Sequence, residues 1–401
     1  MSICTPQLSK SLLIHEAKPY KLLKEENAMD WKQQLITTGE ELKAYMPMTD
    51  EEQMMFEDIT IKHPFCTTKY YLSLINQDDA NDPIRKMQIP SFGEKSEEGA
   101  FDTSGESENT KMQGLQHKYR TTALLLATNS CAMYCRHCFR KRLVGLSNQE
   151  VLSNLENALS YIKAHKEINN VLITGGDAFF LPTEILEVFM EKFSQVDHLN
   201  YIRFGTRLPV VLPDRIIQDE RLVKALKTYS KKKQIYVVTQ FNHPRELTTK
   251  AAAGIQTLKD AGIIVNNQTV LLKGVNDEPE VLAQLMKDLV KHGVNPYYLF
   301  QCRPVKGVKH SFQLPFVKGV KVVEEAKKYL SGHAKRFKFV MSHKTGKIEI
   351  LGEFDKRILF KYHQAPKQSD MGTIFSVKVT EKQGWLDDDF TLDNEDLKKI
   401  G

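Results

Sequence analysis

The chain has 401 residues, of which 41% are hydrophobic and 26% charged, with six cysteines and a formal net charge of +6. This composition is ordinary for a globular protein of one large domain or two to three smaller ones. It excludes a membrane span, because no apolar run approaches the roughly 18 residues required. The mild charge does not predict nucleic-acid binding. No signal peptide is apparent, so we expect the reducing environment of the cytoplasm.

The first part of the chain, to about residue 92, has the charged and periodic pattern of helices, for example over Asn27–Tyr45. Residues 93–112 are rich in Gly, Ser and Glu and contain few apolar residues. Such a composition predicts a flexible connection. We therefore expect a helical N-terminal region over residues 1–115 that includes this connection.

A repeated strand-then-helix pattern occupies residues 116–335. Strand-like apolar runs occur at Leu124–Thr128, Val171–Thr174, Tyr201–Phe204, Ile235–Thr239, Ile263–Val270 and Tyr297–Cys302. Amphipathic stretches lie between them at Asn148–His165, Thr183–Val196, Arg221–Lys231, Thr248–Asp260 and Glu278–His292. Units of this kind predict parallel strands joined by right-handed crossovers. Eight units would close a barrel, so six predict a partial (β/α)6 barrel with an open side.

The tail, residues 336–401, has a different pattern. Phe337–Met341, Lys347–Leu351 and Ile358–Tyr362 are predicted to be antiparallel strands. The acidic stretch from Trp385 to Phe390 is predicted to be a surface appendage. The tail is thus expected to be a small β-rich extension of the α/β barrel.

Three cysteines follow the first barrel strand with C-x₃-C-x₂-C spacing, at Cys131, Cys135 and Cys138. A [4Fe–4S] cluster normally takes four thiolates. With three, one iron remains open to chelate a small molecule, which suits an enzyme better than an electron carrier. A disulfide framework usually belongs to a shorter, cysteine-dense secreted chain, and a zinc site would need a fourth ligand at matching spacing. The motif therefore predicts a [4Fe–4S] cluster.

Polar residues follow the later strands, at the carboxyl edge where parallel α/β folds place their sites. Arg203 and Arg207 bring two guanidinium groups to one strand end, which suits carboxylate or phosphate recognition. A pair of glycines after the second strand allows close approach of the backbone, and glutamines follow the fourth strand and lie in the fifth. The candidate cofactor-binding residues are Gly175, Gly176, Asp177, Gln240 and Gln268.

These segments together resemble the lysine 2,3-aminomutase family of radical S-adenosylmethionine (radical SAM) enzymes, from about residue 30 to residue 365. The matching segments are Asp82–Arg85, His117–Tyr119, Cys131–Arg142, Thr174–Asp177, Gly205–Val211, Phe241–Pro244, Asn267–Asp277 and Pro296–Tyr298. The resemblance implies a cluster on the three cysteines, with SAM held beside the glycines and Gln268. It also implies a 5′-deoxyadenosyl radical that takes a hydrogen from the substrate, and pyridoxal phosphate (PLP) on a lysine.

The chain departs from the family where the substrate is recognised. The resemblance implies that Arg140 binds the substrate α-carboxylate. Arg303 stands where the lysine-specific members carry an aspartate that pairs with the distal ammonium. An arginine there should repel lysine and favour an anionic distal group. The alternative is that Arg303 points elsewhere and makes a surface ion pair.

The PLP lysine is in doubt, because the glycine-rich segment that carries it in the family looks deleted before the strand at Phe337. Lys344 and Lys347 remain nearby as alternative candidates for the lysine that holds PLP, but neither has the desolvated position and phosphate cradle that this role requires, so we expect them at a turn and on a solvated strand. Lys118 replaces the arginine that the family carries near the PLP phosphate.

The leading hypothesis is a radical SAM enzyme that abstracts hydrogen from an amino-acid-like substrate other than free lysine. A PLP-dependent amino acid 2,3-aminomutase remains an alternative, as does a non-catalytic Fe–S or redox-sensing protein. The resemblance implies a flavodoxin- or ferredoxin-type reductant, and it leaves a homo-oligomer open.

Overall fold

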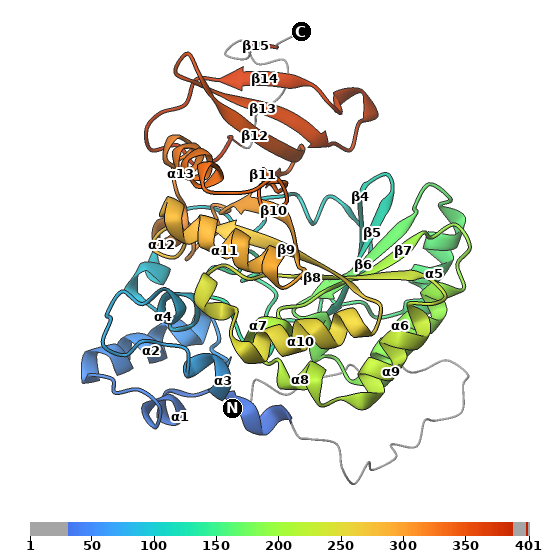
Figure 1. The fold of residues 1–401 in the computed structure, drawn as a ribbon, viewed down its shortest axis with the longest axis horizontal. Coiled ribbons are helices and arrows are strands. Elements are labelled where there is room, and N and C mark those ends of the chain that lie inside the picture. The colour runs from blue at the N-terminus through green and yellow to red at the C-terminus, as the bar shows by residue number, and fades with distance from the viewer. Residues whose placement is uncertain (1–30, 388–397, 400–401) are drawn as a thin grey trace.

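The computed structural model describes residues 31–387 and 398–399. The N-terminal helices are short, and they pack together beside the barrel (Figure 1). They are α1 (Gly39–Lys43), α2 (Asp50–Lys62), α3 (Lys69–Leu72) and α4 (Pro83–Gln88).

The helical pattern predicted over Asn27–Tyr45 is confirmed only in part: α1 lies within it, a strand interrupts it, and its first four residues lie outside the described range. A 3₁₀ turn ends at Gln34, and Leu35–Ile36 (β1) pairs with Thr67–Thr68 (β2). The Thr38 side chain accepts the Glu41 N–H and starts α1 afresh. Tertiary pairing of two apolar residues therefore overrides the helical periodicity.

Six parallel strands pair in sequence order and form an open, partial barrel, as predicted. They are β5 (Thr122–Thr128), β6 (Asn170–Gly175), β7 (Tyr201–Gly205), β8 (Gln234–Thr239), β9 (Ile264–Leu271) and β10 (Asn295–Gln301). The principal crossover helices are α5 (Leu155–Ala164), α6 (Thr183–Ser194), α9 (Glu220–Tyr229), α10 (Thr249–Asp260) and α11 (Pro279–Lys291). Short helices occur at α7 (Leu208–Val211), α8 (Asp214–Ile217) and α12 (Lys309–Phe312). Helix α5 begins later than expected because the Asn154 side chain caps it.

The sheet continues beyond the barrel on both sides. Before β5, strands β3 (Thr110–Met112) and β4 (Leu115–Tyr119) add in antiparallel fashion. After β10, helix α13 (Phe316–Lys328) leads to β11 (Lys338–His343), which is parallel to β10. The expected antiparallel pairing of this strand with the one that follows it, Gly346–Phe354, is confirmed. Its other edge is parallel to β10, because a helical crossover returns the chain to the same end of the sheet.

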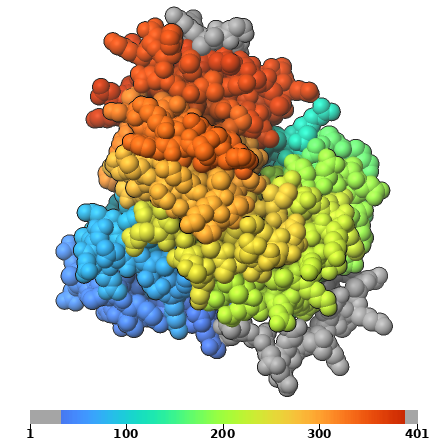
Figure 2. All heavy atoms as spheres, in the orientation of Figure 1, coloured from blue at the N-terminus to red at the C-terminus, as the bar shows by residue number. Residues whose placement is uncertain are grey.

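Antiparallel strands complete the C-terminal side, at β12 (Gly346–Phe354), β13 (Arg357–Gln364), β14 (Ile374–Val377) and β15 (Lys398–Lys399). The atoms of this region and the barrel form one continuous body (Figure 2). Trp385 and Leu386 are buried, which differs from the predicted surface appendage. Their apolar surface is better packed than hydrated, whatever the charge of the residues that follow.

Residues 93–112 differ from the flexible connection that their composition predicts. A 3₁₀ turn (Phe92–Lys95) and β3 lie at either end, and the carboxylates of Glu94 and Glu106 are buried. Asp102 accepts the N–H groups of Ser104, Glu106 and Ser107, which fixes the loop between them. Polar pairing, rather than apolar burial, orders this segment.

Within the described ranges, no helix combines the length and the hydropathy needed to cross a bilayer.

Candidate active site

A cavity of about 400 Å³ lies within the barrel and is lined both by residues at the carboxyl ends of its strands and by Thr122, Asn170 and Tyr201, the first residues of β5, β6 and β7. All ten residues that the sequence singled out as site candidates line it: Cys131, Cys135, Cys138, Arg140, Gly175, Gly176, Asp177, Gln240, Gln268 and Arg303. Lys118 on β4 and Lys347 on β12 line it as well. The walls therefore come from the barrel and from the strands that flank it on both sides.

The cysteine loop presents sulfurs with nearby hydrogen-bond donors. Arg207 donates from Nη1 to Cys135 Sγ at 2.9 Å, and the Arg140 backbone N–H donates to Cys138 Sγ at 3.4 Å. Among the residues described, no three His, Cys, Asp or Glu side chains gather tightly enough to hold one metal ion. A cubane does not require that, because each thiolate binds a different iron. The donor set therefore fits a cluster with three protein ligands.

The two glycines bring the end of β6 against the cysteine loop. A Cβ on Gly175 would lie 2.2 Å from the Thr128 carbonyl oxygen, and one on Gly176 would lie 2.3 Å from the Ser130 carbonyl oxygen. The N–H groups of Gly176 and Asp177 donate to these same carbonyls, at 2.6 and 2.9 Å. The close approach is thus to the loop that carries the cysteines, and both glycines still face the cavity.

Asp177 and Arg207 hold each other's segments in place. The Asp177 carboxylate accepts the Arg207 backbone N–H at 2.6 Å, and burial raises the pKa of this carboxyl to about 6. The Arg207 guanidinium lies 2.5 Å from Glu246 and also donates to the Gln240 carbonyl. Arg207 is thus paired within the protein.

Contrary to the sequence prediction, Arg203 does not share the strand end of Arg207, because it lies in the middle of β7 and donates to Asn170, the first residue of β6. Its Nε–H has no acceptor among the described residues and remains for a ligand.

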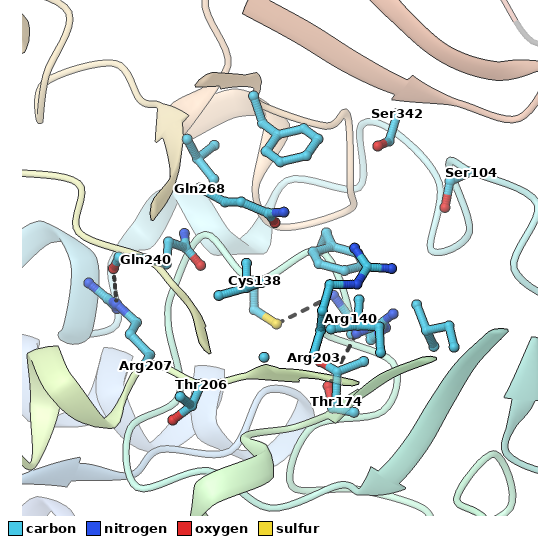
Figure 3. Close-up of a pocket in the computed structure, with 18 of the residues that line it drawn as sticks. Ser104, Cys138, Arg140, Thr174, Arg203, Thr206, Arg207, Gln240, Gln268 and Ser342 are labelled. Carbon is cyan, nitrogen blue, oxygen red and sulfur yellow. Dashed lines mark hydrogen bonds between the residues drawn. The ribbon is translucent and has the colours of Figure 1, made fainter. Parts of the chain in front are cut away.

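Gln240 and Gln268 lie on one side of Cys138, whereas Ser104 and Ser342 lie beyond Arg140 on the other (Figure 3). The Gln240 side chain contacts His137 Nε2 at 3.2 Å. The cavity thus has an amide-rich side near the cysteines and a cationic side near β4 and β12.

The basic residues of the cysteine motif are paired with two buried carboxylates from residues 93–112. Glu94 lies 2.5 Å from Arg136 and also pairs with Lys141. Glu106 lies 2.8 Å from Arg140 and 2.6 Å from Arg142. Each of these cations is therefore paired within the protein, and each of the two carboxylates serves two of them.

Arg303 faces the cavity and does not make the surface ion pair that was its alternative. It donates from Nη1 to Ser104 Oγ at 2.7 Å, and its guanidinium lies 4.0 Å from the Phe139 ring centroid. In the described part of the chain, no carboxylate lies within ion-pair distance of it. Burial lowers its pKa to about 10, still far above neutrality. The group is a buried cation directed toward whatever occupies the cavity.

Comparison with known proteins agrees with this geometry. Residues 125–286 match the model of the radical SAM superfamily. The chain is 38% identical to the L-lysine 2,3-aminomutase of Clostridium subterminale, over 78% of this chain and 76% of that protein. It is 42% identical to an Aquifex aeolicus protein provisionally named L-lysine 2,3-aminomutase, over 87% of this chain and 93% of that one. It is also 34% identical to the glutamate 2,3-aminomutase of Clostridioides difficile, over 77% and 73%.

The chain belongs to the lysine 2,3-aminomutase-like family of radical SAM enzymes. It is an enzyme of the aminomutase type, an isomerase, so the non-catalytic alternative is set aside. The family implies a [4Fe–4S] cluster and SAM, and the cysteine loop described above fits the cluster.

Sequence reasoning about this aminomutase-like enzyme missed where Lys347 lies. The prediction of a solvated strand position is wrong, because its Nζ lies inside the cavity, 4.3 Å from the Tyr298 ring centroid. Lys344 is half-buried and does not line the cavity. Side chains alternate between the two faces of a strand, so the sequence of β12 could have shown which residues face the cavity and which face away. That distinction is possible only once the strands that neighbour β12 are known.

Glu106 should make the stability of the enzyme depend on acid pH. The adjacent arginines hold the pKa of this buried carboxyl at about 2, below its ordinary 4.5. The carboxylate therefore stabilises the fold fully above pH 4.5, and that contribution, about 3 kcal/mol, is lost as pH falls toward 2. We expect Glu106→Gln to flatten the dependence of urea-unfolding free energy on pH between 5 and about 3.

Glu150 provides the control, because it pairs with the same Arg142 but is more exposed. Glu150→Gln should leave the acid dependence nearly unchanged. An equal slope in the wild type and in Glu106→Gln would contradict the pairing with Arg140 and Arg142.

Proposed function

We propose that this enzyme cleaves SAM at a [4Fe–4S] cluster and abstracts hydrogen from an amino-acid-like substrate whose distal group is anionic, rather than from free lysine. Cys131, Cys135 and Cys138 would hold the cluster. When bound, the cluster would supply the electron that cleaves the C–S bond of SAM to give methionine and a 5′-deoxyadenosyl radical. Gly175, Gly176, Asp177, Gln240 and Gln268 would position SAM on the amide-rich side of the cavity.

One observation carries the substrate assignment: the far side of the cavity contains cations without matching acids. Arg303 and Lys347 face it, and the nearest acid, Glu106, is committed to Arg140 and Arg142. A distal ammonium would meet like charges there, whereas a carboxylate would be attracted. The glutamate 2,3-aminomutase among the relatives supports an anionic substrate on this scaffold.

Arg140 is proposed to hold the α-carboxylate, as the family resemblance implies. Its guanidinium now pairs with Glu106, so a bound carboxylate would share or displace that partner. A charge-assisted, two-pronged contact of this kind fixes the orientation of the carbon that loses hydrogen.

The test is anaerobic reconstitution of the full chain, followed by dithionite, SAM and one amino acid at a time. We expect 5′-deoxyadenosine to form, faster with L-glutamate or L-aspartate than with L-lysine. Deuterium from a labelled substrate should appear in the 5′-deoxyadenosine. Formation with L-lysine alone would overturn the anionic assignment, and no 5′-deoxyadenosine with any of them would overturn the proposed chemistry.

A flavodoxin- or ferredoxin-type protein is proposed as the physiological reductant, because the cluster needs one low-potential electron per cleavage. The cytoplasmic location and the homo-oligomer remain predictions from the sequence.

A further inference from the structure

Lys347 presents an amine to the cavity that no other described residue engages by a hydrogen bond or ion pair. Its Nζ lies 4.3 Å from the Tyr298 ring centroid and 5.8 Å from the ring centroids of Tyr119 and Phe300. The other lysine lining the cavity is Lys118, whose Nζ donates to the Ser104 and His343 carbonyls at 2.8 and 2.7 Å. Of the two, Lys347 therefore has the amine available for a ligand.

The surroundings of this amine favour its neutral form. Arg203 on β7, Arg303 after β10 and Lys118 on β4 bring positive charge toward it. Burial, followed by these cations, lowers the pKa of Lys347 to about 7. A substantial fraction of the amine is then unprotonated near neutral pH, and an unprotonated amine is a nucleophile.

Several buried side-chain atoms that line the same cavity have no hydrogen-bond partner among the described residues, and two of them, Arg203 Nε and Gln116 Nε2, can only donate. Arg203 uses Nη2 for Asn170 Oδ1 at 2.6 Å, so its Nε–H remains for a ligand. A buried donor without an acceptor is costly. An oxyanion would satisfy it and would also balance the excess positive charge.

We propose that Lys347 is a carbonyl-binding residue, which forms an imine with an aldehyde or ketone whose anionic group is held by Arg203. The amine nitrogen bonds to the carbonyl carbon, and the oxygen leaves as water with the two amine hydrogens, so no electron is transferred. The shared ligand chemistry is an anionic carbonyl compound, whether a coenzyme aldehyde or a carbonyl of the substrate. This inference rests on the proposed function in one respect: it takes the cavity to be the place where the proposed reaction occurs.

The test uses the full, cluster-reconstituted chain and three probes: pyridoxal phosphate, pyridoxal and glyoxylate. Cyanoborohydride converts an imine to a stable secondary amine, and peptide mapping by mass spectrometry locates it. We expect pyridoxal phosphate or glyoxylate to label Lys347, and pyridoxal, which lacks the phosphate, to label it about tenfold less. Labelling by pyridoxal phosphate indicates a coenzyme aldehyde, and labelling by glyoxylate alone indicates a substrate carbonyl.

Variants separate this site from surface amines. Lys347→Met should abolish the label and Lys344→Met should keep it, since Lys344 lies three residues away and outside the cavity. Lys347→Arg keeps a cation but cannot form the imine, so it serves if the methionine variant folds poorly. Arg203→Gln should reduce pyridoxal phosphate labelling to the level of pyridoxal.

Three results would overturn the proposal. The label could be spread over surface lysines, it could be absent from Lys347 with every probe, or it could be lost in Lys344→Met to the same extent as in Lys347→Met. Trapping uses cyanoborohydride only to reduce the imine, and it requires neither SAM nor dithionite reduction of the cluster. A protein that is labelled on Lys347 but forms no 5′-deoxyadenosine would therefore sink only the proposed function, and the reverse result would sink only this inference.

Discussion

Replacing Cys135 with alanine is expected to remove the visible absorbance of the reconstituted cluster and to reduce 5′-deoxyadenosine formation to background. The loop offers three thiols for a cluster that needs one per iron, so the loss of one leaves two irons without protein ligands. It also leaves the Arg207 guanidinium, which lies 2.9 Å from this sulfur, without its thiolate acceptor. Iron content per chain and chromatography of 5′-deoxyadenosine give the measurement.

Cys66 is the matched control, since it is buried near the same loop and its thiol donates to the Ala132 carbonyl at 3.4 Å, yet it does not line the cavity. Cys66→Ala should keep the iron and the cleavage of SAM. Full iron content together with normal cleavage in Cys135→Ala would refute the assignment of this loop as the cluster site.

Reversing the charge at Arg303 is expected to give the second large effect. Arg303→Asp should lower kcat/KM for an anionic substrate on the order of a thousandfold, because a buried attraction of several kcal/mol becomes a repulsion. The ratio of L-glutamate to L-lysine turnover should fall at the same time. Arg303→Lys keeps the charge but loses the planar fork over Phe139 and the contact with Ser104, so we expect a loss of about tenfold.

Arg336→Asp tests whether any arginine near the C-terminal strands would behave in this way. Arg336 is exposed and donates to Asn295 Oδ1 at 2.5 Å, outside the cavity. The Arg336→Asp variant should leave the ratio of L-glutamate to L-lysine turnover unchanged. An unchanged ratio in Arg303→Asp, with the variant folded by thermal unfolding, would contradict the role given to Arg303.

The sequence predicted the parts of the site that depend on local order along the chain. Residues such as Cys138, Gly175 and Gln240 lie at or just beyond the ends of apolar strands, and parallel pairing in sequence order brings these ends together. Arg303, which follows the last barrel strand, was predicted in the same way. Local pattern was sufficient for these residues because the fold places every strand end at one edge.

Glu94 and Glu106 could not be predicted in this way. Their segment has the composition of a disordered connection, and their arginine and lysine partners lie more than thirty residues further along the chain. A carboxylate is stable in the interior only when its partners are already in place, so its burial is a property of the assembled fold.

The place of Lys347 and the parallel pairing of β11 with β10 were missed for a related reason. The short run Lys344-Thr345-Gly346-Lys347 resembles a solvated turn, and its second lysine reaches the cavity only because β12 pairs with β11, which pairs in turn with β10. Strand direction depends on the crossover through α13 rather than on residues within the strand.

One continuous sheet runs from β3 to β15, so the molecule cannot easily be divided into segments that could be exchanged between homologues. Glu106 precedes the barrel, the cysteines lie within it, and Lys347 follows it, yet all three face one cavity. A change of substrate would therefore require coordinated replacements in regions that are distant in the chain, while the SAM-facing loops could stay fixed. Chimeras that exchange the barrel alone should inherit the radical chemistry of one parent without its substrate.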